Sequence, residues 1–256
     1  MIDRKLYLYQ WARRNRLRIL MYHSISDTAR DRDAVTPAMF AAQMEYLANS
    51  NFEVVALADA CRLLNTGGDL RRKIVLTFDD GYRDFLNALP VLDAHRFPAT
   101  LFVVTGCIGQ TAHWHSTDKS RPLLTRDQLQ AERAAGIALG SHSVTHPDLT
   151  ALDESALAAE LEMAHATMRD FGETFFPFAY PGGRFTSRER AAVKRAGYDC
   201  AVIVGGRWGN GAETDRLLLK REPMMASDTL AWFKKRVNGY YEWHYLGARV
   251  RGINTR

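Results

Sequence analysis

Short apolar runs alternate with helix-like stretches along most of this chain, and this alternation limits the folds open to it. The candidate strands are 18–22, 52–56, 73–78, 99–104, 137–140, 175–179, 200–204 and 217–219. Such runs, separated by amphipathic segments, predict parallel strands joined by helices, in an open sheet or a closed barrel. In both architectures, chemistry gathers where the strands end on their carboxyl side.

The stretches between these runs carry helix start signals. Thr36 precedes Pro37, an arrangement typical of a capped first turn. Thr125 with Gln128, and the same spacing at Thr186, form capping-box patterns. These signals support a chain in which helices regularly follow strands.

Composition excludes several classes of protein. A chain of 256 residues with 46% hydrophobic and 25% charged residues can bury a full core as an ordinary globular α/β protein. The net charge of +5 comes without an RNA-recognition or helix-turn-helix pattern, so we expect no nucleic-acid partner. Cys61, Cys107 and Cys200 lie far apart in sequence, which predicts buried, reduced thiols.

Two aspartates end the strand predicted at 73–78. Asp79 and Asp80 precede Gly81, which lets the backbone turn tightly. Successive side chains of a strand point in opposite directions, so one carboxylate can bind an ion while the other faces substrate. The pattern also fits a plain Asp-Asp-Gly turn or a magnesium phosphotransfer site.

Two histidines follow the strand predicted at 137–140. His142 and His146 are four residues apart, and Pro147 disfavours a helix at the second histidine, which predicts a single turn or a tight loop. Such a pair can also be exposed or core histidines, but imidazole ligands favour zinc over magnesium. With one aspartate they form a zinc-type set that leaves a position open for water. The second aspartate could then be a general base, so the pattern predicts a metal-dependent hydrolase.

Several segments, in their order and spacing, resemble the polysaccharide deacetylases (carbohydrate esterase family 4, the NodB homology domain). They are TFDDG at 77–81, SHSVTH at 141–146, FAYPGG at 178–183, PATLFV at 98–103 and ILMYH at 19–23. The last is similar to a bacterial subgroup that includes deacetylases of exported polysaccharides. The resemblance implies a distorted (β/α)7 TIM-like barrel. It also implies metal-assisted removal of N-acetyl groups, or less often O-acetyl groups, from an amino-sugar glycan or glycan precursor.

The resemblance also implies roles for individual residues. Asp80, His142 and His146 would hold a divalent metal, with Zn²⁺ first and Co²⁺ or Ni²⁺ as alternatives. Asp79 would be the base that takes a proton from the metal-activated water. The backbone N–H of Gly182 would stabilise the oxyanion. Tyr180, Pro181 and Trp208 would contact substrate.

The chain departs from the family pattern in its third and fifth motifs, and Arg207-Trp208 is a loose match to the Asp-Trp pair of the fourth. Ala179 stands where the family often has an arginine that steadies the catalytic aspartate. Arg221 is our first candidate for a substitute cation, and Arg207 is the second. The histidine that usually supplies the general acid has no counterpart near 217–221. His23 is the alternative, because it follows the first predicted strand.

These departures leave two other functions open. One is a carbohydrate-binding barrel that has lost turnover. The other is a deacylase of a small-molecule, nucleotide-linked or lipid-linked sugar. Neither the sugar nor the oligomeric state follows from the sequence.

We expect three segments: a basic, aromatic one at 1–17, a catalytic domain at 18–239 and a basic tail at 240–256. We recognise no secretory signal and no membrane span, so we expect a cytoplasmic protein. The segment 1–17 offers peripheral contact with the inner face of the membrane.

Overall fold

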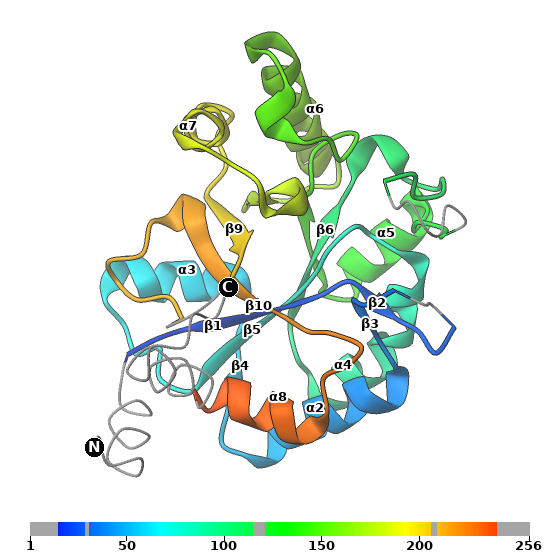
Figure 1. Ribbon diagram of the computed structural model, residues 1–256, viewed down its shortest axis with the longest axis vertical. Coiled ribbons are helices and arrows are strands. Elements are labelled where there is room, and N and C mark those ends of the chain that lie inside the picture. Colours follow the sequence, from blue (N-terminus) through cyan, green and yellow to red (C-terminus); the bar gives the residue numbers. More distant parts are fainter. Residues whose placement is uncertain (1–14, 29–30, 115–120, 206–208, 240–256) are drawn as a thin grey trace, which may run out of the picture.

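Seven parallel strands close into a barrel in the computed structural model, which describes residues 15–28, 31–114, 121–205 and 209–239 (Figure 1). The first and last strands of the ring are neighbours, because β1 pairs with both β10 and β5. In ring order the strands are β1 (Arg18–Tyr22), β10 (Leu219–Pro223), β9 (Cys200–Val204), β8 (Pro177–Ala179), β7 (Ala138–Ser141), β6 (Ala99–Val103) and β5 (Lys73–Phe78). The predicted (β/α)7 TIM-like barrel is confirmed.

Three further strands are short. β4 (Glu53–Val54) pairs with the first residues of β5 outside the ring. β2 (Ser24–Ile25) and β3 (Ala34–Val35) form a separate parallel pair. β4 lies within the strand predicted at 52–56, whereas β2 and β3 were not predicted, because neither belongs to a longer apolar run.

The helices surround the ring of strands (Figure 1). They are α2 (Pro37–Asn49), α3 (Leu57–Thr66), α4 (Leu89–His95), α5 (Arg126–Ala134), α6 (Glu154–Asp170), α7 (Ser187–Arg195) and α8 (Leu230–Val237). The predicted helix starts are confirmed, since Thr36 accepts a hydrogen bond from the Met39 N–H and both capping boxes form at Thr125 and Thr186.

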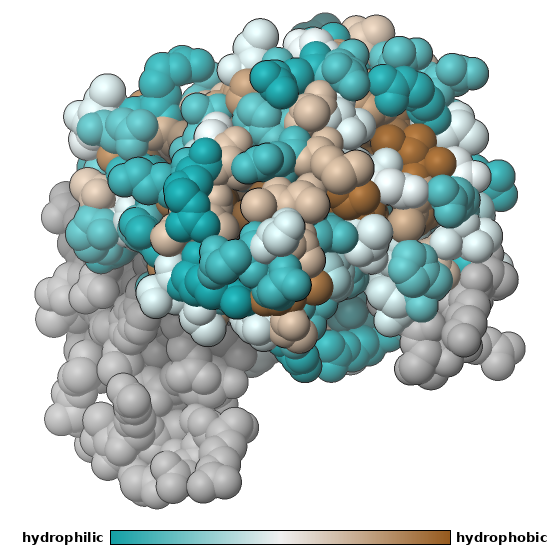
Figure 2. All heavy atoms as spheres, turned by 90° about the horizontal axis from the view of Figure 1, so that it is seen from above, coloured by the Kyte–Doolittle hydropathy of each residue, from teal (hydrophilic) through white to brown (hydrophobic). Residues whose placement is uncertain are grey.

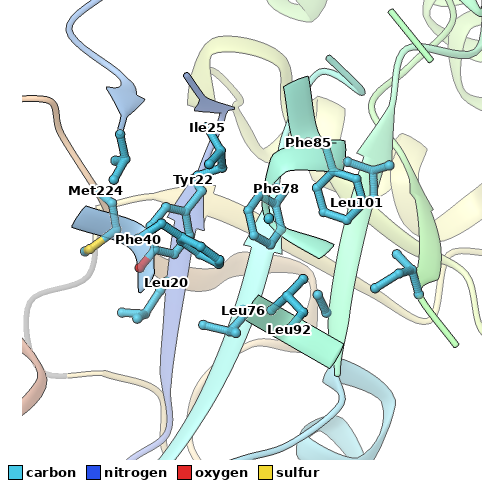
Figure 3. Packing of buried hydrophobic residues seen from close by; sticks show 14 of the residues in the cluster. Leu20, Tyr22, Ile25, Phe40, Leu76, Phe78, Phe85, Leu92, Leu101 and Met224 are labelled. Carbon is cyan, nitrogen blue, oxygen red and sulfur yellow. The ribbon is translucent and has the colours of Figure 1, made fainter. Parts of the chain in front are cut away.

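Two hydrophobic clusters lie on opposite faces of the strands. Side chains alternate along a strand, so Leu20 and Leu76 face the helices while Ile19 and Val75 face the ring interior. On the outer face the Tyr22 and Phe78 rings stack with centroids 5.3 Å apart, and Phe78 meets Phe85 edge-on at 4.9 Å (Figure 3). Inside the ring, Ile19, Val75 and the other residues of their cluster fill the space near the start of the strands.

Helix α6 covers the barrel with an apolar stripe. Its buried residues are Leu157, Leu161, Ala164 and Met168. Figure 2 views the molecule from above, from the side on which α6 and α7 lie in Figure 1, and there hydrophilic residues surround small hydrophobic areas. The stripe fixes α6 on the barrel, which matters for the site described below.

The prediction for the last strand is wrong. The apolar residues Leu217 and Leu218 belong to a 3₁₀ turn, Arg216–Leu218, that is capped by Asp215, and strand β10 begins only at Leu219. This strand carries Lys220, Arg221 and Glu222, so its hydrophobic pattern is interrupted by charge. This segment is a strand because it is buried and pairs with β1 and β9, and not because it is apolar.

Residues 1–14 and 240–256 lie outside the described part of the chain. The division into three segments and the membrane contact of 1–17 therefore stay predictions. Among the described residues, no helix has the length and apolar character that a membrane crossing requires.

Candidate metal centre

The aspartate pair follows β5 at the carboxyl end of the barrel. The N–H of Asp79 still donates to the Tyr22 carbonyl at 3.0 Å, which extends the pairing with β1. The backbone then turns, with φ of 72° at Asp80 and 75° at Gly81. An aspartate tolerates this left-handed conformation better than most residues. The turn sends the two carboxylates to different partners.

Asp79 is paired with Arg221 inside the barrel. Two hydrogen bonds of 2.6 Å join the guanidinium to the two carboxylate oxygens, and Arg221 is fully buried. Burial is the largest influence and would raise the pKa of Asp79, but the Arg221 charge opposes it, and the net pKa lies below the ordinary value. Asp79 is therefore ionised at neutral pH.

Asp80 meets both histidines. The Nε2 atoms of His142 and His146 each lie 3.5 Å from Asp80 Oδ1, and the ligand atoms of all three residues lie within 4.8 Å of one another. Ligands about 2.0–2.2 Å from a tetrahedral ion are themselves roughly 3.3–3.6 Å apart. The separations from Asp80 therefore match a single ion.

The orientation of His142 also suits an ion. Its Nδ1 lies 2.8 Å from the Ala179 carbonyl oxygen, which can only accept, so Nδ1 carries the hydrogen. The lone pair is then on Nε2, the atom that faces Asp80. Metal-binding histidines usually have such an outer partner. The donor set of two imidazoles and one carboxylate fits a zinc-type ion.

The two histidines lie on a loop after β7. Ser143 has φ of 64° and His146 has φ of 60°, both in the left-handed region. Such residues cost about 1–3 kcal/mol each and persist only where the surroundings hold them. Of the single turn or tight loop predicted here, the structure has the loop, since residues 142–148 form no helix.

Two aromatic residues without a predicted role contact the candidate ligands. Tyr82 is buried and forms a hydrogen bond with Asp80; burial, followed by the Asp80 charge, raises the Tyr82 pKa far above its ordinary value. The Arg121 guanidinium lies 3.6 Å above the Tyr82 ring. The Trp114 ring stacks on His146 with centroids 4.8 Å apart. The position of Tyr82 directly after Asp-Asp-Gly was the one sequence signal for it.

A cavity of about 330 Å³ joins these elements. It is lined by the two aspartates, by the two histidines and by His23 and Gly182. Arg32 and Asp33, from the segment between β2 and β3, also line it. Sequence reasoning missed this last pair because it belongs to no motif.

The remaining predicted residues lie in different surroundings. The Nδ1 atom of His23 is buried and has no hydrogen-bond partner among the described residues. Tyr180 belongs to the cavity wall, but its ring is 1% exposed and packs against Phe178 and Phe185. Pro181 is buried. Trp208 and Arg207 lie outside the described residues.

A family model described as polysaccharide deacetylase matches residues 67–201, which is more than half of the chain. The chain belongs to the polysaccharide deacetylase family. The matched segment of this deacetylase homologue contains Asp79, Asp80, His142 and His146. His23 and Arg221 lie outside it.

Two relatives and one solved structure resemble this family member. The provisionally named polysaccharide deacetylase YxkH of Bacillus subtilis (strain 168) is 30% identical over 190 residues, covering 73% of this chain and 64% of YxkH. Poly-beta-1,6-N-acetyl-D-glucosamine N-deacetylase of Staphylococcus aureus (strain MSSA476) is 23% identical over 178 residues, covering 64% of this chain and 59% of the staphylococcal protein. The chain thus spans about three fifths of the length of these relatives.

The solved structure is that of the Streptococcus pyogenes deacetylase PplD in complex with acetate. It superimposes with a TM-score of 0.74 at 23% identity, over 86% of this chain and 97% of that chain. At this identity the likeness supports the barrel fold alone.

Proposed function

We propose that this chain is a metal-dependent hydrolase that removes N-acetyl groups from an amino-sugar glycan or glycan precursor, with O-acetyl esters as the alternative bond. One observation carries the proposal. An ion-binding group of Asp80, His142 and His146 lies beside an arginine-paired carboxylate, Asp79, in one cavity. Family membership and the named activity of the staphylococcal relative support the acetylated amino sugar as substrate.

Zinc is the proposed metal because two imidazoles and one carboxylate are typical of catalytic zinc sites, with cobalt and nickel as alternatives. When bound, the ion supplies Lewis-acid chemistry that polarises the acyl carbonyl and makes water more acidic.

The protein's own residues carry the remaining steps. Asp79, ionised and fixed by Arg221, accepts the proton of the attacking water. The Gly182 N–H at the cavity wall stabilises the negative oxygen of the tetrahedral state. Breakdown of that state then needs a proton for the leaving amine.

We assign that proton donor to His23. It follows β1, the strand that pairs with β5, and it lines the same cavity as Asp79. Its buried Nδ1 lacks a hydrogen-bond partner among the described residues. His23→Gln should lower turnover about 10²-fold while metal content stays unchanged. Unchanged turnover in this variant would remove His23 from the mechanism.

Acetate release tests the function. Zinc-loaded protein is incubated with β-1,6-linked and β-1,4-linked N-acetylglucosamine oligomers, a nucleotide-linked N-acetylhexosamine and a simple acetyl ester, with Asp79→Asn as the control. We expect release from at least one N-acetylated sugar, strongly reduced in the control. If stoichiometric zinc is bound but no substrate is turned over, the hydrolase proposal fails and a carbohydrate-binding barrel replaces it.

A further inference from the structure

The loop that carries both histidines is held by one side chain of a neighbouring helix. The Glu160 carboxylate on α6 accepts the N–H groups of Val144 and Thr145 at 2.7 and 2.9 Å, and the Thr145 hydroxyl at 2.6 Å. These two residues lie between the left-handed Ser143 and His146. Glu160 therefore binds the middle of the turn that sets the spacing of the histidines.

The opposite side of the loop is held by backbone. Thr105 N–H donates to the Ser143 carbonyl at 3.0 Å, and Gly106 N–H donates to the Val144 carbonyl at 2.9 Å. A Cβ added at Gly106 would lie 2.8 Å from the Val144 oxygen, so only glycine allows this approach. The loop is thus clamped between two elements, and Glu160 is the side-chain half of the clamp.

Glu160 is itself well anchored on α6. Its neighbours Leu157 and Leu161 are fully buried, which fixes α6 on the barrel. Within the described part of the chain, its carboxylate forms no ion pair with lysine or arginine, and its hydrogen bonds go to the histidine loop. A half-buried carboxylate with such partners is suited to holding backbone in place.

We propose that Glu160 is a positioning residue of the metal centre, which holds the 143–146 turn so that the two imidazoles converge with Asp80. The inference rests on the metal site of the proposed function. It assigns Glu160 no contact with the ion or the substrate. Outer-sphere partners of this kind typically change metal affinity by about 10–100-fold when they are removed.

The matched variants separate geometry from charge. Glu160→Ala removes all three hydrogen bonds and should weaken Zn²⁺ affinity by about 10–100-fold. Glu160→Gln keeps an acceptor oxygen for both N–H groups and an amide that can donate to the Thr145 hydroxyl. It should therefore bind Zn²⁺ within about threefold of wild type, since the hydrogen bonds rather than the charge hold the turn.

The experiment measures Zn²⁺ affinity by competition with a chromogenic chelator and records the visible absorption of the Co²⁺-loaded protein. The Co²⁺ spectrum reports ligand geometry, so Glu160→Ala should shift it and Glu160→Gln should not. Thermal unfolding of each protein without metal shows whether the variant is folded. If Glu160→Ala does not fold, Glu160→Asp, whose shorter chain cannot reach both N–H groups, replaces it with the same expected direction.

Each outcome decides a separate question. A wild-type protein that binds no metal refutes the proposed function itself. Wild-type binding with unchanged affinity and spectrum in the folded Ala or Asp variant overturns only the role of Glu160. Equal losses in Glu160→Gln and Glu160→Ala would also overturn it, because charge and not the position of the loop would then be responsible.

Discussion

The two halves of the proposed metal centre are held in opposite ways. The carboxylate half, after β5, depends on buried side chains: Arg221 binds Asp79 inside the barrel, and Tyr82 binds Asp80. The histidine half, after β7, depends on backbone groups that bond to the half-buried Glu160 and to Thr105 and Gly106, which follow the neighbouring strand β6.

This difference separates stability from metal binding. A buried ion pair broken on one side leaves an uncompensated charge, so changes in the carboxylate half should affect folding and turnover together. The histidine loop lies nearer to solvent, where lost bonds are replaced more easily by water. Changes in the histidine loop should therefore lower the metal affinity more than they lower the free energy of unfolding.

The largest effect is expected when a ligand is lost. His146→Ala removes one of three donors, so Zn²⁺ affinity should fall by more than the roughly 100-fold expected of an outer-sphere change. Metal content after dialysis, measured by atomic absorption, and acetate release should fall together. His95→Ala, a change on α4 away from the cavity, is the matched control and should keep both. Retained metal in His146→Ala would show that this histidine is no ligand.

The next effect tests the proposed base. Asp79→Asn should lower turnover by about 10²–10⁴-fold, because it removes the proton acceptor, while zinc stays bound. Turnover and metal content are measured on the same preparation, at a temperature where the variant is folded. Asp69→Asn, at an exposed ion pair, is the control. A full rate in Asp79→Asn would contradict the base assignment.

The third effect concerns stability. Arg221→Met leaves Asp79 ionised, buried and unpaired, and should lower the free energy of unfolding by about 3–5 kcal/mol in denaturant titrations. The double variant Asp79→Asn with Arg221→Met should recover part of this loss, since neither charge then remains. A single variant as stable as wild type would mean that the ion pair does not hold this half of the site.

The smallest effect concerns Tyr82, which supports Asp80 in the carboxylate half. Tyr82→Phe removes one hydroxyl beside Asp80 and should weaken Zn²⁺ affinity by about 10-fold. The ion pair between Arg221 and Asp79 should stay in place. Chelator competition measures the affinity. Tyr46→Phe, on α2, is the control, because it removes a hydroxyl that contacts Asn238 and does not line the cavity. Equal affinities of Tyr82→Phe and wild type would remove Tyr82 from the support of the ligand.

Most of the barrel followed from apolar runs, because strands buried on both faces are continuous in hydrophobicity. Strand β10 could not be found this way, since Arg221 and Glu222 interrupt its pattern. Its arginine is buried only because Asp79 neutralises it, and that contact joins residues 142 positions apart. No local signal reports such a pairing, and Arg221 became the first candidate for it only through the resemblance to the family.

The ligand candidates followed from residue type and spacing, but their supports did not. Tyr82 and Trp114 contact candidate ligands from two loops, and Glu160 holds the histidine loop from a helix, but none belongs to a recognisable metal motif. Their roles depend on which loops meet at the barrel rim, and that is set by the closure of the ring. Trp208 stays a prediction, because it lies outside the described residues.

Ring closure has a consequence for synthesis of the chain. Both segments that carry proposed ligands are synthesised well before β10. Strand β10 must then insert between β1 and β9 before its Arg221 can pair with Asp79. Until then the nascent polypeptide exposes an aspartate with no counter-charge on an incomplete sheet. The proposed base therefore gains its partner only when β10 is in place, and a fragment limited to residues 67–201 should be inert even though it carries every proposed ligand.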